Sequence, residues 1–411
     1  MSLLRSISTI AGSSVLSQVI GAVSLWLISH RYGMGEVGVY ALTYSIVLIG
    51  AQVCTFASQL LLPKQSDDWL VQNIVFCLLQ SLIVALPFTA AVVVLFDKPF
   101  GLFYLLTVVH AWVLVSENLL MRDEKMALLA LQRISMSVVV ISMIALSHTA
   151  LWFYWAWATI AFGLIILWLC YSTPLKQLRW SHVSWTNLRH FYRANHHHIS
   201  KVGSAEVLAM ANNNLPMVLI NFWFSSVTAG YFAVVSRFCL APVVIVGNAV
   251  RNSIFSKWSI DFRHQRFNYP EFVKVRKLLF VLGLVATAGV FIFYPLVMEF
   301  AYAQHWVSRE WVESVPTSRY MLPYLFPALA VCPLTVIELV FGSPRYFLRI
   351  QIEQLAAVVL AFVVLPYFYP DYGMSVLAFA VLSALRYGFI YLKVNQRARL
   401  MRESVGETHA Q

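Results

Sequence analysis

Apolar runs of about 20 residues recur along almost the whole chain, and short polar turns separate them. A helix of about 20 residues spans the roughly 30 Å hydrocarbon core of a bilayer. The pattern therefore predicts an all-α polytopic membrane protein with about twelve transmembrane helices. We place them at 7–29, 37–61, 71–96, 100–120, 128–147, 150–171, 200–223, 231–252, 277–297, 319–341, 347–369 and 373–393.

The composition agrees with this pattern. The chain has 411 residues, of which 60% are hydrophobic and only 11% charged, and this balance excludes an ordinary soluble protein. In a soluble chain a net charge of +11 would suggest binding to nucleic acid, but here the membrane topology explains the positive charge better. The five cysteines lie inside apolar runs and show no metal-binding or disulfide spacing. We therefore expect no metal, no cofactor and no nucleic-acid partner.

The distribution of lysine and arginine predicts the orientation. With the N-terminus placed inside, 23 of the 29 Lys and Arg residues fall in segments on that side, 4 in the opposite turns and 2 within spans. Positive residues accumulate on the cytoplasmic side of membrane proteins. The prediction is thus a multi-pass protein of the bacterial inner membrane with both termini in the cytoplasm.

A basic, aromatic and histidine-containing segment, 172–199, lies near the midpoint of the chain. Such a segment suits a cytoplasmic amphipathic linker on the inner leaflet. We expect an N-terminal six-helix bundle over 1–171, a C-terminal six-helix bundle over 200–394 and a cytoplasmic tail over 395–411.

An internal repeat supports two pseudo-symmetric bundles. Gly38-Val39-Tyr40-Ala41 matches Gly230-Tyr231-Phe232-Ala233 at an offset of 192 residues, and each segment opens a span after an external turn. Both copies enter from the same side, so the prediction is parallel repeats related by an axis along the membrane normal.

Polar residues inside the predicted spans of the second half mark a candidate binding site. At the repeat offset, Ser45 corresponds to Arg237, Ser14 to Glu206, and Gly21 and Ala22 to Asn213 and Asn214. Polar groups at membrane depth are costly and usually face a bundle interior or a watery cavity. The candidate substrate-binding residues are Arg237, Arg386, Asn212, Asn213, Asn214, Glu206 and Gln18.

Several of these residues also have a structural interpretation. Glu206 and Arg386 lie at a similar predicted depth and would suit an ion pair between helices. The asparagines would suit interhelical hydrogen bonds. We expect Glu117 to be interfacial and Arg133 to extend toward the headgroups. Pro323, Pro327 and Pro333, in the predicted span 319–341, predict an irregular helix.

At these residues the chain resembles a known family. The run Ala229–Arg237, followed by Pro242, Gly247-Asn248-Ala249 and Ile254-Phe255, resembles the start of the second half of polysaccharide and O-antigen (Wzx-type) flippases. These belong to the multidrug/oligosaccharidyl-lipid/polysaccharide (MOP) exporter superfamily. Arg31–Tyr40 is similar to the family's first external turn and second span. One departure is that Asn212–Asn214 stand where many relatives have an acidic residue.

The resemblance implies a transporter rather than an enzyme. It implies that an undecaprenyl-diphosphate-linked O-antigen or polysaccharide repeat unit crosses the inner membrane by alternating access, without ATP hydrolysis. The implied partners are the lipid-linked oligosaccharide, membrane lipids and the polysaccharide polymerase machinery. Buried arginines would suit the diphosphate, and amide groups would suit the sugar.

Two other function classes remain open from the sequence. A drug or cation exporter of the same superfamily would be expected to carry acidic residues deep in the bundle, whereas this chain carries two arginines and one glutamate there. A membrane polysaccharide polymerase or acyltransferase would need chemistry at a membrane face. The longest predicted external segment, 299–317, has no recognisable catalytic spacing.

Overall fold

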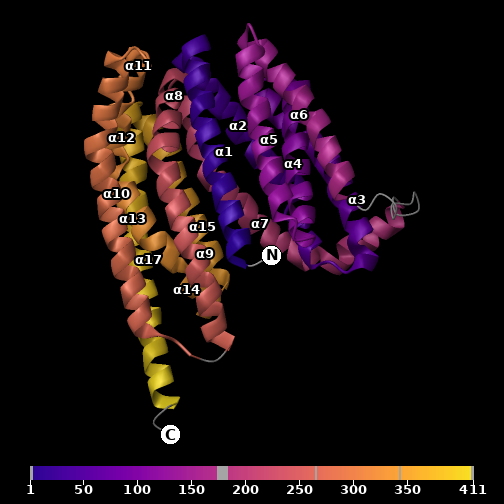
Figure 1. Ribbon diagram of the computed structural model, residues 1–411, viewed down its shortest axis with the longest axis vertical. Coiled ribbons are helices and arrows are strands. Elements are labelled where there is room, and N and C mark those ends of the chain that lie inside the picture. Colours follow the sequence, from indigo (N-terminus) through magenta and orange to yellow (C-terminus); the bar gives the residue numbers. More distant parts are fainter. Residues whose placement is uncertain (1–2, 174–183, 264–265, 342–343, 409–411) are drawn as a thin grey trace. The chain divides into compact units, whose positions relative to one another are not determined.

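The computed structural model describes residues 3–173, 184–263, 266–341 and 344–408, and every regular element within them is a helix (Figure 1). The predicted all-α class is therefore confirmed. A helix satisfies its backbone hydrogen bonds within one segment, which a chain surrounded by lipid requires.

The chain forms two compact units, Met1–Val218 and Leu219–Gln411. The first unit contains α1 (Leu3–Tyr32), α2 (Met34–Thr55), the 3-10 helix η1 (Ser58–Lys64), α3 (Asp67–Phe96), α4 (Phe100–Arg122), α5 (Met126–Leu146), α6 (Ala150–Ser172) and most of α7 (Trp185–Trp223).

The second unit contains more interrupted helices. They are α8 (Ser226–Val235), the π-helical turn η4 (Ser236–Leu240), α9 (Ala241–Arg263), α10 (Tyr269–Ala303), α11 (Arg309–Val312), α12 (Val315–Tyr320), α13 (Leu322–Val331), the 3-10 turn η5 (Cys332–Thr335), α14 (Val336–Phe341), α15 (Pro344–Val359), the π-helical turn η6 (Leu360–Val364), α16 (Leu365–Phe368) and α17 (Tyr372–Thr408).

Nine helices of the described residues are long and apolar enough to cross a membrane, or ten if the bent pair Arg309–Tyr320 and Leu322–Glu338 forms one span. Each of the twelve predicted spans contains helix, but α1 and α7 are not among these nine. The polar residues of α7 lower its apolar character. The bent pair turns by 58° at its break, which confirms the irregular helix predicted from the prolines.

Some predicted boundaries differ from the observed helices. The predicted span 37–61 is too long, because α2 ends at Thr55 and the next two residues, Phe56 and Ala57, have φ angles of 44° and 60°. A non-glycine residue with positive φ cannot continue a right-handed helix. The predicted linker 172–199 lies partly outside the described residues. From Trp185 onward it belongs to one continuous helix that reaches Trp223.

Helix α4 lies at the centre of the first unit, where it packs against α2, α3, α5 and α6. An aromatic cluster beside it places the ring of His110 at 5.7 Å from Tyr44 and at 6.0 Å from Trp157, both nearly perpendicular. Edge-to-face contacts of this kind stabilise the packing of aromatic rings. The cluster joins α4 to α2 and α6.

The core of the second unit gathers large side chains from helices far apart in the sequence. Trp258 of α9, Phe272 of α10, Ile337 of α14 and Ile390 of α17 are all buried in one cluster. The middle of α10, in contrast, exposes many large apolar side chains, such as Leu284 and Phe293. A helix with such an apolar exposed face fits contact with lipid chains.

Candidate functional site

The polar stretch of α7 belongs to the first unit. Glu206 and Asn213 are exposed, Met210 between them is half-buried, and their spacing puts them on one helix face. Asn212 is buried, with 6% of its surface exposed. The amide of Asn214 donates to the backbone oxygen of Met210 at 2.9 Å. One asparagine is thus partly engaged by its own helix.

A close approach holds α7 against the end of α2. A Cβ atom added at Gly203 would lie 2.6 Å from the backbone oxygen of Phe56 and 2.5 Å from its ring. Any larger side chain would force the two segments apart. Gly203 therefore fixes the position of the helix that carries Glu206 and the asparagines. Gln18 of α1 is half-buried in the same unit.

Arg237 lies in the second unit, inside the π-helical turn η4. Its side chain is half-buried, and the next residue, Phe238, packs edge-on against Trp311 at 5.7 Å. A π-helical turn inserts one residue into the helical ladder and occurs frequently at functional sites. The sequence singled out Arg237 but did not predict this turn.

Arg386 of α17 lies half-buried among aromatic residues of the second unit. Its Nη1 donates to the backbone oxygen of Ile350 at 3.0 Å, and its guanidinium carbon lies 4.7 Å from the centroid of the Tyr387 ring. Its Nε is buried and has no hydrogen-bond partner among the described residues. An unpaired buried donor costs on the order of 1–3 kcal/mol. The Nε–H group of Arg386 is therefore a hydrogen-bond donor that could bind an anion.

A further half-buried arginine, Arg251, lies on α9 of the same unit and is not among the residues selected from the sequence. Helix α9 packs against α13, α14 and η5, and α17, which carries Arg386, also packs against η5. Cys332 opens η5, where Pro333 interrupts the helix that continues as α14. The predicted span 231–252 ends next to Arg251, which places this residue at the end of a span. The packing of α9 on η5 is a contact between distant segments, which no local pattern records.

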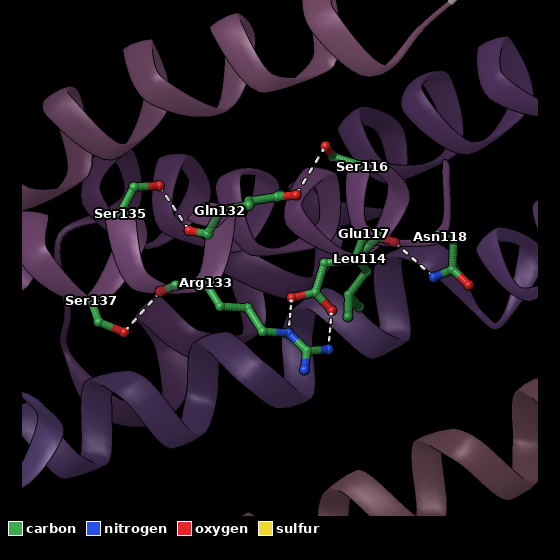
Figure 2. A network of polar contacts seen from close by, with 8 residues as sticks. All are labelled: Leu114, Ser116, Glu117, Asn118, Gln132, Arg133, Ser135 and Ser137. Atoms are coloured by element: carbon green, nitrogen blue, oxygen red, sulfur yellow. Dashed lines mark hydrogen bonds and ion pairs between the residues drawn. The ribbon is translucent and has the colours of Figure 1, made fainter. Parts of the chain in front are cut away.

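An ion pair joins α4 to α5 in the first unit, and Figure 2 shows the two side chains facing each other. The Nε and Nη2 atoms of Arg133 donate to the two carboxylate oxygens of Glu117, each at 2.8 Å. Two parallel hydrogen bonds make this a strong form of ion pair. From the sequence we expect Arg133 to extend toward the headgroups and Glu117 to be interfacial, and this pairing is not predicted.

Weaker polar contacts extend this network to α6. Ser116 lies 3.3 Å from Gln132 and 3.2 Å from Ser172, and the indole nitrogen of Trp168 donates to Ser135 at 3.2 Å. The network links three helices by side-chain hydrogen bonds inside apolar surroundings. Its charges compensate each other, so it fits a structural role better than an anion site.

The predicted site residues thus fall into two sets. Gln18, Glu206, Asn212, Asn213 and Asn214 belong to the first unit, and Arg237 and Arg386 belong to the second. Within the second unit, the helices that carry Arg251 and Arg386, α9 and α17, both pack against η5. The pairing of Glu206 with Arg386 stays a prediction. Among the described residues, no group of three His, Cys, Asp or Glu side chains could hold a metal ion.

No protein-family model and no curated protein sequence matches the chain. Solved structures do match it. A multidrug resistance MATE family transporter of the MOP superfamily, in an inward-facing conformation, has a TM-score of 0.65 at 14% identity and covers 98% of this chain and 96% of its own. The lipid II flippase MurJ, in an inward closed conformation, has a TM-score of 0.74 at 13% identity, covering 95% and 89%.

The MATE multidrug transporter DinF-BH also matches, with a TM-score of 0.64, 12% identity and 96% coverage of each chain. Similarity over almost the full length of each protein extends to both units. At these identities it establishes the fold. The protein is a multi-pass helical membrane protein with the fold of MOP superfamily transporters.

Proposed function

We propose that the protein is a flippase that moves a polysaccharide or O-antigen repeat unit, linked to undecaprenyl diphosphate, across the bacterial inner membrane by alternating access. The substrate-binding residues would be Arg237, Arg386 and the polar residues of α7. Both termini would lie in the cytoplasm, and the polysaccharide polymerase machinery would take up the product.

The observation that carries this proposal is the set of arginines within the helices of the second unit. Arg237 lies in a π-helical turn, and Arg251 and Arg386 lie on helices α9 and α17, which both pack against the η5 break. Placing guanidinium groups within apolar helices is costly, and an anionic substrate would offset that cost. A diphosphate matches the forked donors of arginine. The buried Nε of Arg386 offers a donor to such a group.

The fold similarity is compatible with two functions. The match to the lipid II flippase MurJ supports a lipid-linked substrate, whereas the matches to multidrug transporters support a drug exporter. The charge of the site favours the first alternative. A site for cationic drugs would be expected to present acidic residues rather than arginines.

Substitution of Arg237 tests the proposal in the native cell. Arg237→Ala should accumulate to normal levels but lose surface polysaccharide, because the anion loses a forked donor. Arg237→Lys should retain part of the activity, and Arg237→Glu should have none. The measurement is surface polysaccharide at matched protein amount.

A suitable control is Arg349→Ala, because Arg349 is 66% exposed and pairs with Glu353 one turn away on α15. This variant should keep normal polysaccharide. Wild-type polysaccharide in an Arg237→Ala strain would contradict the proposal. Loss of drug resistance in that strain, with polysaccharide unchanged, would favour the exporter.

A further inference from the structure

The first turns of α7 have a face that packs against the first unit. Leu188 packs on Val75 of α3, and Phe191 and Ile199 pack on Leu61 of η1. Phe191 is completely buried. The apolar side of this amphipathic segment is thus covered by protein, and the side next to it faces outward.

This exposed side has a different character, and it borders α3 at Tyr192, whose ring lies 6.3 Å from that of Phe76. Trp185 is 74% exposed and Tyr192 47% exposed, and Arg189 and Arg193 are also exposed. Residues three and four apart share one side of a helix, so these four form a continuous surface. We call it the basic-aromatic face.

The charge around this face has one sign. Residues 185–201 include two arginines, one lysine and four histidines, but no aspartate or glutamate. The nearby carboxylate of Asp67, at the start of α3, already pairs with Arg122. The face therefore presents positive charge and aromatic rings without a neutralising carboxylate in its own segment.

The position of the face corresponds to a membrane boundary. Val71 and Val75, on which Leu188 packs, lie in the first two turns of the membrane-capable stretch Trp69–Phe96. The start of α7 therefore lies beside the end of a span, at the level where lipid headgroups begin. Tryptophan and tyrosine are enriched at this level, and arginine binds anionic lipid there.

We propose that the basic-aromatic face binds the headgroups of anionic phospholipids in the leaflet where α3 begins. Arg189 and Arg193 contact the phosphates, and Trp185 and Tyr192 enter the headgroup layer. The bound lipid holds the start of α7 at the membrane surface and so anchors the connection between the two units. This inference does not depend on which substrate is transported.

The test uses the full-length protein in lipid nanodiscs. Lipids brominated near the headgroup quench the fluorescence of nearby tryptophans. Because the chain has 13 tryptophans, the fluorescence of Trp185 is obtained by subtracting the fluorescence of the Trp185→Phe variant. Brominated phosphatidylglycerol should quench this signal more strongly than brominated phosphatidylcholine. The preference should be roughly fivefold per arginine and should weaken at high salt.

The double variant Arg189→Gln/Arg193→Gln should lose the preference. The control variant Lys98→Gln/Arg309→Gln removes the same number of positive charges at positions distant in sequence from the face, and it should keep the preference. Both double variants should have the same thermal stability as the unsubstituted protein. Equal quenching by the two lipids would overturn the proposal. So would a preference that survives in Arg189→Gln/Arg193→Gln, or no quenching by either lipid, which would place the face in water or against another protein.

Discussion

Removal of either partner of the Glu117–Arg133 ion pair should destabilise the first unit by roughly 2 kcal/mol. Removing one partner from a fully buried pair costs about 3–5 kcal/mol, whereas exposed pairs contribute about 0–1 kcal/mol. The side chains of Glu117 and Arg133 are 14% and 31% exposed, between these limits. The loss arises mostly because the remaining charge stays partly buried without its partner.

A double-mutant cycle on thermal unfolding in detergent measures this effect. For a unit of 150–250 residues, about 2 kcal/mol corresponds to a fall in Tm of roughly 4–8 °C. Glu117→Leu and Arg133→Met should each cause such a fall, and the double variant should recover most of it, since no lone charge remains. Additive losses in the double variant would refute the reasoning.

The pair between Asp67 and Arg122 provides a matched control. It also joins two helices of the first unit, but the side chain of Asp67 is 86% exposed. Asp67→Asn should therefore change the free energy of unfolding by no more than about 1 kcal/mol. If Asp67→Asn lowers the free energy of unfolding as much as Glu117→Leu does, burial does not determine how much each ion pair contributes to stability.

Three further outcomes are expected. Gly203→Val should lower thermal stability because its side chain would collide with the backbone of Phe56, and unchanged stability would contradict the close approach. If Glu206 and Arg386 pair, each alanine variant should lower the protein level and the double variant should recover it, whereas additive loss argues against pairing. A reporter fused after Arg402 should report the cytoplasm, and an external signal would reverse the predicted orientation.

Much of the fold could be predicted from apolar length alone. Runs that match the bilayer thickness predicted α3, α4 and α6 with ends within a few residues, because each must bury its backbone polar groups in a single helix. Prolines likewise predicted the broken helix that contains η5. These features depend on nearby residues, which the sequence displays directly.

The remaining features depend on contacts between distant segments. The carboxylate of Glu117 and the guanidinium of Arg133 meet because α5 packs on α4, and the helix that carries Arg251, α9, packs on η5. A helix end at Phe56 depends on two residues with positive φ, which are not glycine. Neither helical periodicity nor composition carries this information.

The π-helical turn η4 has a consequence for the ancestry of the two halves. In this turn the hydrogen bonds run from residue i to i+5, so the helix contains one residue more than an α-helix of the same length. In the predicted repeat its counterpart is α2, which is an uninterrupted α-helix from Met34 to Thr55. An alignment of the halves should therefore change its offset from 192 to 193 after Leu240. On this prediction, a single inserted codon would account for the π-helical turn that carries Arg237.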